Sequence, residues 1–86
     1  MIMWYVYALR TEGGNIYVGS TNDLKRRIRE HERGLNEYTK LRRPIRLECY
    51  IAVRSEGVAR ELEKYLKVGS GKAFLKKRIL SYEALA

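Results

Sequence analysis

A five-residue turn separates the first two segments of regular structure that the sequence predicts. Residues 11–15 (Thr-Glu-Gly-Gly-Asn) lie between residues 3–9 and residues 16–19, and both flanking segments are rich in aromatic and β-branched side chains. Such segments favour strands, and a short glycine-containing turn between them is typical of a β-hairpin. We therefore expect the chain to begin with two antiparallel strands.

A basic helix and a third strand are expected after the hairpin. Asn22 is the predicted cap of the helix, with Asp23 in its first turn, and Gly34 is the predicted stop. The third strand is expected over about residues 45–53, after a loop that contains Pro44.

Two further helices complete the predicted order. Ser55 is the predicted cap of a helix that continues to Lys67, and a last helix is expected from Ser70 to about Leu80. The sequence thus predicts one α+β domain over residues 1–86. It is a three-stranded antiparallel sheet flanked by helices in β-β-α-β-α-α order, with the helices on one side.

Helical spacing indicates which side chains of the first helix face the core. At about 100° per residue, Leu24, Ile28 and Leu35 share one face. Arg27 and His31 lie one turn apart at the border of that face. A charged group beside a buried stripe is costly without a partner, so this placement favours a functional site.

The same spacing predicts the orientation of the second helix. Val58, Leu62 and Leu66 form its expected core stripe, and Glu61 and Tyr65 fall at the border. Taken alone, Glu61 fits a solvated or salt-bridged helix residue better than a site residue, and His31 alone fits an ordinary boundary histidine better.

The net charge of the chain is +8 and is unevenly distributed. Between Lys25 and Arg46 there are nine basic residues and three acidic ones. Clustered positive charge favours binding to a polyanion, because each phosphate contact releases condensed counterions. A solvated surface that serves solubility alone is the alternative.

The chain shows no sign of export or of membrane insertion. It has a single cysteine, which indicates a reducing compartment, and no apolar run that approaches the length of a membrane span. Residues 1–9 lack the basic start and the cleavage site of a signal peptide. We expect a cytoplasmic protein without membrane contact.

Several ordered motifs resemble the GIY-YIG endonuclease superfamily, especially its small single-domain relatives. The chain has Tyr5-Val6-Tyr7 and Tyr17-Val18-Gly19 in the two hairpin strands, then Arg27 and His31 on the helix. The resemblance covers about residues 4–67. It departs from the homing enzymes at Tyr5, where their motif has glycine. Many family members also carry a late asparagine that supports the site, and no asparagine follows Asn36 in this sequence.

The resemblance implies a hydrolytic DNA endonuclease with five catalytic residues. Tyr17 would be the general base, Tyr7 would hold the water or the phosphate, and Arg27 would stabilise charge on phosphate oxygens. His31 would orient a tyrosine or a phosphate, or accept the tyrosine proton. Glu61 would bind one divalent metal ion, Mg²⁺ or alternatively Mn²⁺.

Binding to DNA is expected to use basic residues of the first helix and of the loop after it. They are Arg26, Arg29, Arg33, Lys40, Arg42 and Arg43. The DNA partner would be branched or single-stranded, as in repair or processing. Target specificity would come from DNA shape or from a protein partner, or it would be low. Two other functions stay open: a catalytically silent nucleic-acid-binding module of the same fold, and a structural or oligomerisation domain.

Overall fold

The computed structural model describes residues 2–80 and contains one three-stranded antiparallel sheet. Its strands are β1 (Trp4–Arg10), β2 (Ile16–Thr21) and β3 (Arg46–Val53), in the order β2-β1-β3. The predicted hairpin is confirmed, and its register places Tyr7 opposite Gly19. β2 therefore has a free edge, which becomes important for the site.

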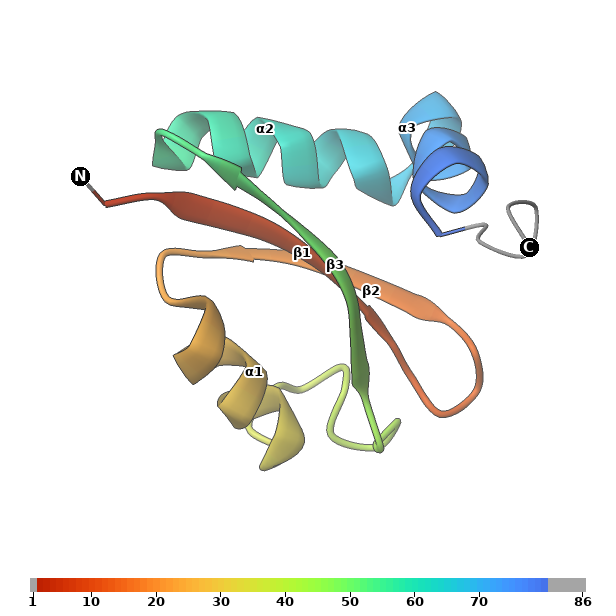
Figure 1. Ribbon diagram of the computed structural model, residues 1–86. Coiled ribbons are helices and arrows are strands. Elements are labelled where there is room, and N and C mark those ends of the chain that lie inside the picture. The colour runs from red at the N-terminus through yellow and green to blue at the C-terminus, as the bar shows by residue number, and fades with distance from the viewer. Residues whose placement is uncertain (1, 81–86) are drawn as a thin grey trace.

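Helices cover both faces of the sheet, so the expectation that they share one side is wrong (Figure 1). α1 (Leu24–Glu32) lies on one face, and α2 (Glu56–Lys67) lies on the other together with the C-terminal helices. Alternate residues of β1 serve the two faces, because successive strand side chains point to opposite sides. Val6 and Ala8 belong to the core cluster beneath α2, whereas the buried Tyr7 lies outside that cluster.

The ends of α1 are set by Asp23 and Gly34. Asp23, not Asn22, is the N-cap, since its carboxylate accepts a hydrogen bond from the backbone N–H of Arg26. Gly34 has a φ of 80°, a left-handed conformation that suits glycine just beyond a helix end. The predicted stop is confirmed. Leu35, which follows it, is 65% exposed and is not a core residue.

α2 begins after Ser55, whose hydroxyl accepts the backbone N–H of Val58 as predicted. Its orientation differs from the predicted one. Val58 is 55% exposed, and the residues buried against the sheet are Ala59 and Leu66. The stripe therefore follows positions 59, 62, 63 and 66, with the spacing of one helical face.

The predicted last helix is present as two consecutive segments. α3 spans Gly69–Phe74 and is followed by η1 (Leu75–Ile79), a π-helical turn. Ser70 lies one residue inside α3, and no side chain caps the first turn. Leu75 and Leu80 close the core beside α2. Within residues 2–80, no helix is long and apolar enough to span a membrane.

Candidate active site

A buried hydrogen-bonded chain begins at Tyr7 on β1. The Tyr7 hydroxyl lies 2.9 Å from Nε2 of His31 on α1, and Nδ1 of His31 lies 2.7 Å from the Thr39 hydroxyl. The side chains of all three residues are buried. Tyr7 and His31 are thus brought together as the motif analysis requires, whereas Thr39 was not predicted.

The series of hydrogen-bonded side chains continues through Asn36 to Tyr17 on β2. Thr39 donates its hydroxyl hydrogen to Oδ1 of Asn36 at 3.3 Å, and Nδ2 of Asn36 donates to the Tyr17 hydroxyl at 3.4 Å. The same Oδ1 accepts the backbone N–H groups of Tyr38 and Thr39, a local turn typical of asparagine. This turn fixes the Asn36 amide so that its nitrogen faces Tyr17.

The order of donors assigns the tautomer of His31. Because the Thr39 hydroxyl donates to Asn36, it accepts from His31, which places the imidazole hydrogen on Nδ1. Nε2 then accepts the hydrogen of the Tyr7 hydroxyl. Two tyrosine hydroxyls are therefore linked through three polar side chains across one face of the sheet.

Burial is the main cause of the shifted pKa values of Tyr7 and His31. It raises the pKa of Tyr7 to about 12, against the opposing influence of the Arg27 charge. Burial, together with Arg27, lowers the pKa of His31 to about 4. At neutral pH Tyr7 is therefore a hydrogen-bond donor, and His31 is an uncharged acceptor.

Tyr17 is held by rings on several sides. Its ring centroid lies 6.3 Å from Tyr7, 5.1 Å from His31 and 5.6 Å from Tyr38. Tyr38 stacks on it with 28° between the ring planes, and the Arg42 guanidinium carbon lies 3.9 Å from the Tyr38 ring centroid. These contacts orient Tyr17 and still leave it partly exposed at the edge of the sheet.

Arg27 supplies positive charge beside the tyrosines. Its guanidinium donates to Glu30 at 2.8 Å, and its side chain is 29% exposed. Its charge opposes the rise in the Tyr7 pKa and contributes to the low His31 pKa. Arg27, the third residue of the predicted site, therefore lies beside Tyr7 and His31 and is partly exposed.

Gly19 allows the tyrosines to approach one another. A Cβ atom at this position would lie 2.5 Å from the Tyr7 hydroxyl and 3.1 Å from Cε2 of Tyr17. Any side chain here would displace one of the two rings. The glycine of the second motif is therefore required by close packing within the site.

Besides Glu30, which pairs with Arg27, the site has a second carboxylate beside it, that of Glu63. One of its oxygens accepts the Ser20 hydroxyl at 2.6 Å at the end of β2, and the other lies 2.6 Å from the Lys67 ammonium. Burial opposes its ionisation, but Lys67 and Ser20 together outweigh burial, so the pKa of Glu63 lies below its ordinary value. Its negative charge also contributes to the raised pKa of Tyr7.

Glu61, the residue predicted to bind metal, lies away from this cluster. Its side chain is 78% exposed, and its only ion pair among residues 2–80 is with Lys64 at 3.8 Å. The expectation that Glu61 borders the buried stripe is wrong, because the stripe includes positions 59 and 63 instead of position 58. Ala59 at the centre of the stripe was the signal that could have identified Glu63.

The predicted DNA-binding residues have different environments. Arg29 and Arg33 are exposed, and neither has an ion-pair partner among residues 2–80. Others of the set make contacts within the protein: Arg26 with Glu30, Lys40 with Glu37, Arg42 with the Tyr38 carbonyl, and Arg43 with the carbonyls of Glu32 and Lys40. The two cations of the set without such contacts therefore lie on the last turn of α1 and at its C-cap, while Arg42 and Arg43 also hold the loop.

Comparisons with known proteins agree with this arrangement. The model of the GIY-YIG catalytic domain matches residues 3–79. The chain is 39% identical over 61 residues to UPF0213 protein Reut_B5558 of Cupriavidus pinatubonensis, covering 70% of this chain and 68% of that protein. It is 37% identical over 75 residues to UPF0213 protein ORF82 of Orgyia pseudotsugata multicapsid polyhedrosis virus, covering 84% and 71%.

A solved structure extends the likeness to the whole fold. The solution NMR structure of UPF0213 protein BH0048 from Bacillus halodurans is 31% identical, with a TM-score of 0.59 over 98% of this chain and 94% of that one. The tyrosines, histidine and arginine of the site all fall within the matched residues 3–79. The chain therefore belongs to the GIY-YIG catalytic domain family, a superfamily of nucleases.

Proposed function

We propose that this protein is a metal-dependent DNA endonuclease that hydrolyses phosphodiester bonds in repair or processing of branched or single-stranded DNA. The observation that carries the proposal is the polar chain from Tyr7 through His31 to Tyr17. Arg27 lies beside this polar chain, and the Glu63 carboxylate accepts a hydrogen bond from Ser20 on β2. A structural domain has no need for this grouping, since buried polar groups are costly unless each is satisfied.

The two tyrosines have different tasks in the proposed reaction. Tyr7 keeps its proton, because its pKa is about 12, and it positions the attacking water or the phosphate through its hydroxyl. Tyr17 is less enclosed and removes the proton of the water. Neutral His31 holds the Tyr7 hydroxyl and accepts its hydrogen bond.

Arg27 binds the scissile phosphate in this proposal. A guanidinium can give two parallel hydrogen bonds to phosphate oxygens and stabilise the charge that develops on them. The Glu30 carboxylate holds Arg27 in the absence of DNA. When the phosphate binds, it replaces the Glu30 carboxylate as the anionic partner of Arg27, so the Arg27 guanidinium stays paired.

A single divalent ion fits the donor set around Glu63. Mg²⁺ commonly binds one or two carboxylates, several waters and substrate phosphates, so it needs no cage of protein ligands. Glu63 is ionised and half-buried, and the Lys67 ammonium occupies one of its oxygens, so a metal ion would displace Lys67 from that oxygen. We therefore assign Glu63, in place of Glu61, as the residue that holds Mg²⁺ or Mn²⁺. The ion would polarise the phosphate and lower the pKa of a bound water.

A matched pair of glutamates tests the proposal. We expect Glu63→Gln to lower the rate of cleavage by about a hundredfold or more, because the amide keeps the size of the side chain but loses the metal-binding charge. Glu61→Gln is the same substitution two residues away on the exposed side of α2 and should cut at the wild-type rate.

The assay uses linear, single-stranded, flapped and branched DNA with Mg²⁺ or Mn²⁺, and folding is checked by circular dichroism. Cleavage that depends on Glu61 and not on Glu63 would overturn the assignment of the carboxylate. If the wild-type protein binds DNA but cuts none of these substrates, the silent-binder function replaces the proposal.

A further inference from the structure

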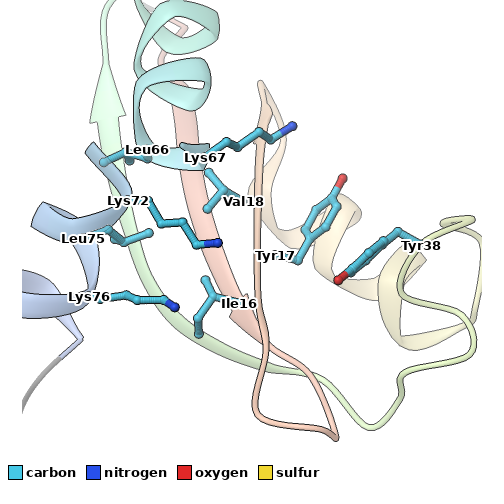
Figure 2. Close-up of a pocket in the computed structure, with 9 residues that line it drawn as sticks. All are labelled: Ile16, Tyr17, Val18, Tyr38, Leu66, Lys67, Lys72, Leu75 and Lys76. Carbon is cyan, nitrogen blue, oxygen red and sulfur yellow. The ribbon is translucent and has the colours of Figure 1, made fainter. Parts of the chain in front are cut away.

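A pocket of about 250 Å³ follows the free edge of β2 beside the candidate active site. Figure 2 shows the side chains of Lys67, Lys72 and Lys76 reaching toward β2 from the helices, with Tyr17 and Tyr38 on the other side of the strand. Tyr17 belongs both to this pocket and to the proposed catalytic chain. A ligand in the pocket would therefore lie next to the reacting groups.

The floor of the pocket is apolar and its rim is cationic. Ile16 and Val18 of β2 and Leu66 and Leu75 of the helices form the floor. Lys67 pairs with Glu63, but neither Lys72 nor Lys76 has an ion-pair partner among residues 2–80. Two ammonium groups that have no counter-ion within residues 2–80 lie beside an aliphatic surface, and this arrangement fits a ligand that combines a flat apolar body with negative charge.

We propose that this pocket receives one unpaired nucleotide of the DNA strand that is cut. The base lies on the aliphatic floor around Ile16 and Leu75, and the flanking phosphates lie on Lys72 and Lys76. The inference rests on the proposed function, because it assigns the pocket to the same strand that Tyr17 contacts.

Size and position favour a single nucleotide over a larger ligand. The pocket is smaller than the range of about 300–1,000 Å³ that is common for small-molecule sites. Among the described strands β2 pairs with β1 alone, so outward-facing backbone N–H and C=O groups along its edge are available to the polar rim of a base. A base inside a duplex is stacked and paired and must first be extruded, so an unpaired strand enters at lower cost.

Binding measurements without metal test the pocket separately from cleavage. A short single-stranded DNA is compared with an abasic strand of equal length by fluorescence anisotropy in chelator. Both strands carry the same phosphates, so their affinity ratio reports on the base. We expect the normal strand to bind on the order of tenfold more tightly.

Two matched sets of variants locate the effect. Ile16→Ala should reduce the normal-to-abasic ratio, while Ile45→Ala, the same change at a half-buried position outside the pocket, should leave it unchanged. The double variant Lys72→Ala/Lys76→Ala should make the slope of log K against log salt less steep by about 1.4, since each phosphate contact contributes about 0.7 on a single strand. Lys64→Ala/Lys77→Ala removes the same charge from exposed positions outside the pocket and should change the slope much less.

Each result bears on one proposal. Equal affinity for normal and abasic strands, equal effects of the two lysine pairs, or equally strong competition by an acidic peptide of the same charge would overturn the nucleotide pocket. A wild-type protein that cuts DNA but shows equal affinities would retain the nuclease function alone. A protein that discriminates the strands but never cuts would retain the pocket alone. The lysine pairs are exposed, so their test does not depend on the folding of Ile16→Ala.

Discussion

Acidification should destabilise this protein through its one histidine before any carboxylate contributes. Burial, together with the Arg27 charge, lowers the pKa of His31 from 6.5 to about 4. The unfolded chain therefore takes up a proton as the pH falls below about 6.5, while the folded chain does not. The stabilisation is complete above that pH and is lost as the pH falls toward about 4.

The expected magnitude follows from the two pKa values. One pKa unit corresponds to about 1.4 kcal/mol, so the full effect is about 3 kcal/mol and about 2 kcal/mol of it is lost by about pH 5. The pKa values of Glu30, Glu48 and Glu63 lie below 4.5, so these groups act at lower pH. The interval between about pH 7.5 and about pH 5 therefore isolates His31.

Urea unfolding followed by circular dichroism, in chelator, measures this loss. The chain contains a single histidine, so His31→Gln removes the only side chain whose ordinary pKa lies in the interval, and the unfolding free energy of the variant should be nearly constant there. The imidazole resonance of the wild-type protein should titrate near pH 4 by NMR. A wild-type unfolding free energy that is equal at both ends of the interval, or an imidazole midpoint near 6.5, would refute the reasoning.

Other substitutions test the packing and the charges of the site. Gly19→Ala should lower the unfolding free energy by about 1–3 kcal/mol, because its Cβ would meet the Tyr7 hydroxyl, whereas Gly57→Ala has open space on α2 and should be neutral or stabilising in thermal denaturation. Tyr17→Phe should abolish cleavage and leave DNA affinity unchanged, and equal loss of both would contradict its role as base. Arg29→Ala/Arg33→Ala should weaken binding to all sequences alike and lower the salt slope by about two, and a sequence-dependent effect would argue against phosphate contacts.

Much of the local structure could be read from residue types that act through near neighbours. The turn at residues 11–15, the cap at Ser55 and the stop at Gly34 were all identified, because each depends on backbone geometry within a few residues. The two tyrosine strands and the pair Arg27 and His31 were identified from the sequence motif. Their order along the chain is itself the motif.

The faces of the helices depended on tertiary packing. Apolar spacing favoured Val58 over Ala59, since valine is the larger apolar residue, yet close approach of α2 to the sheet needs the small side chain. Because of this error the predicted helix was rotated about its axis, and Glu61 instead of Glu63 was expected at the border of the buried face. Placement of α1 on the opposite face also depends on contacts between distant segments, such as that of His31 on α1 with Tyr7 on β1.

Thr39 and Asn36 show why the site could be only partly predicted. Both lie in a loop without hydrophobic periodicity. Thr39 is fully buried, and its hydroxyl contacts His31 of α1. Hydrogen bonds between residues that are far apart in the chain follow from the packed fold. Residue spacing was sufficient for the tyrosines and for the arginine–histidine pair, whereas the polar chain that joins them and the carboxylate beside them required the assembled sheet and helices.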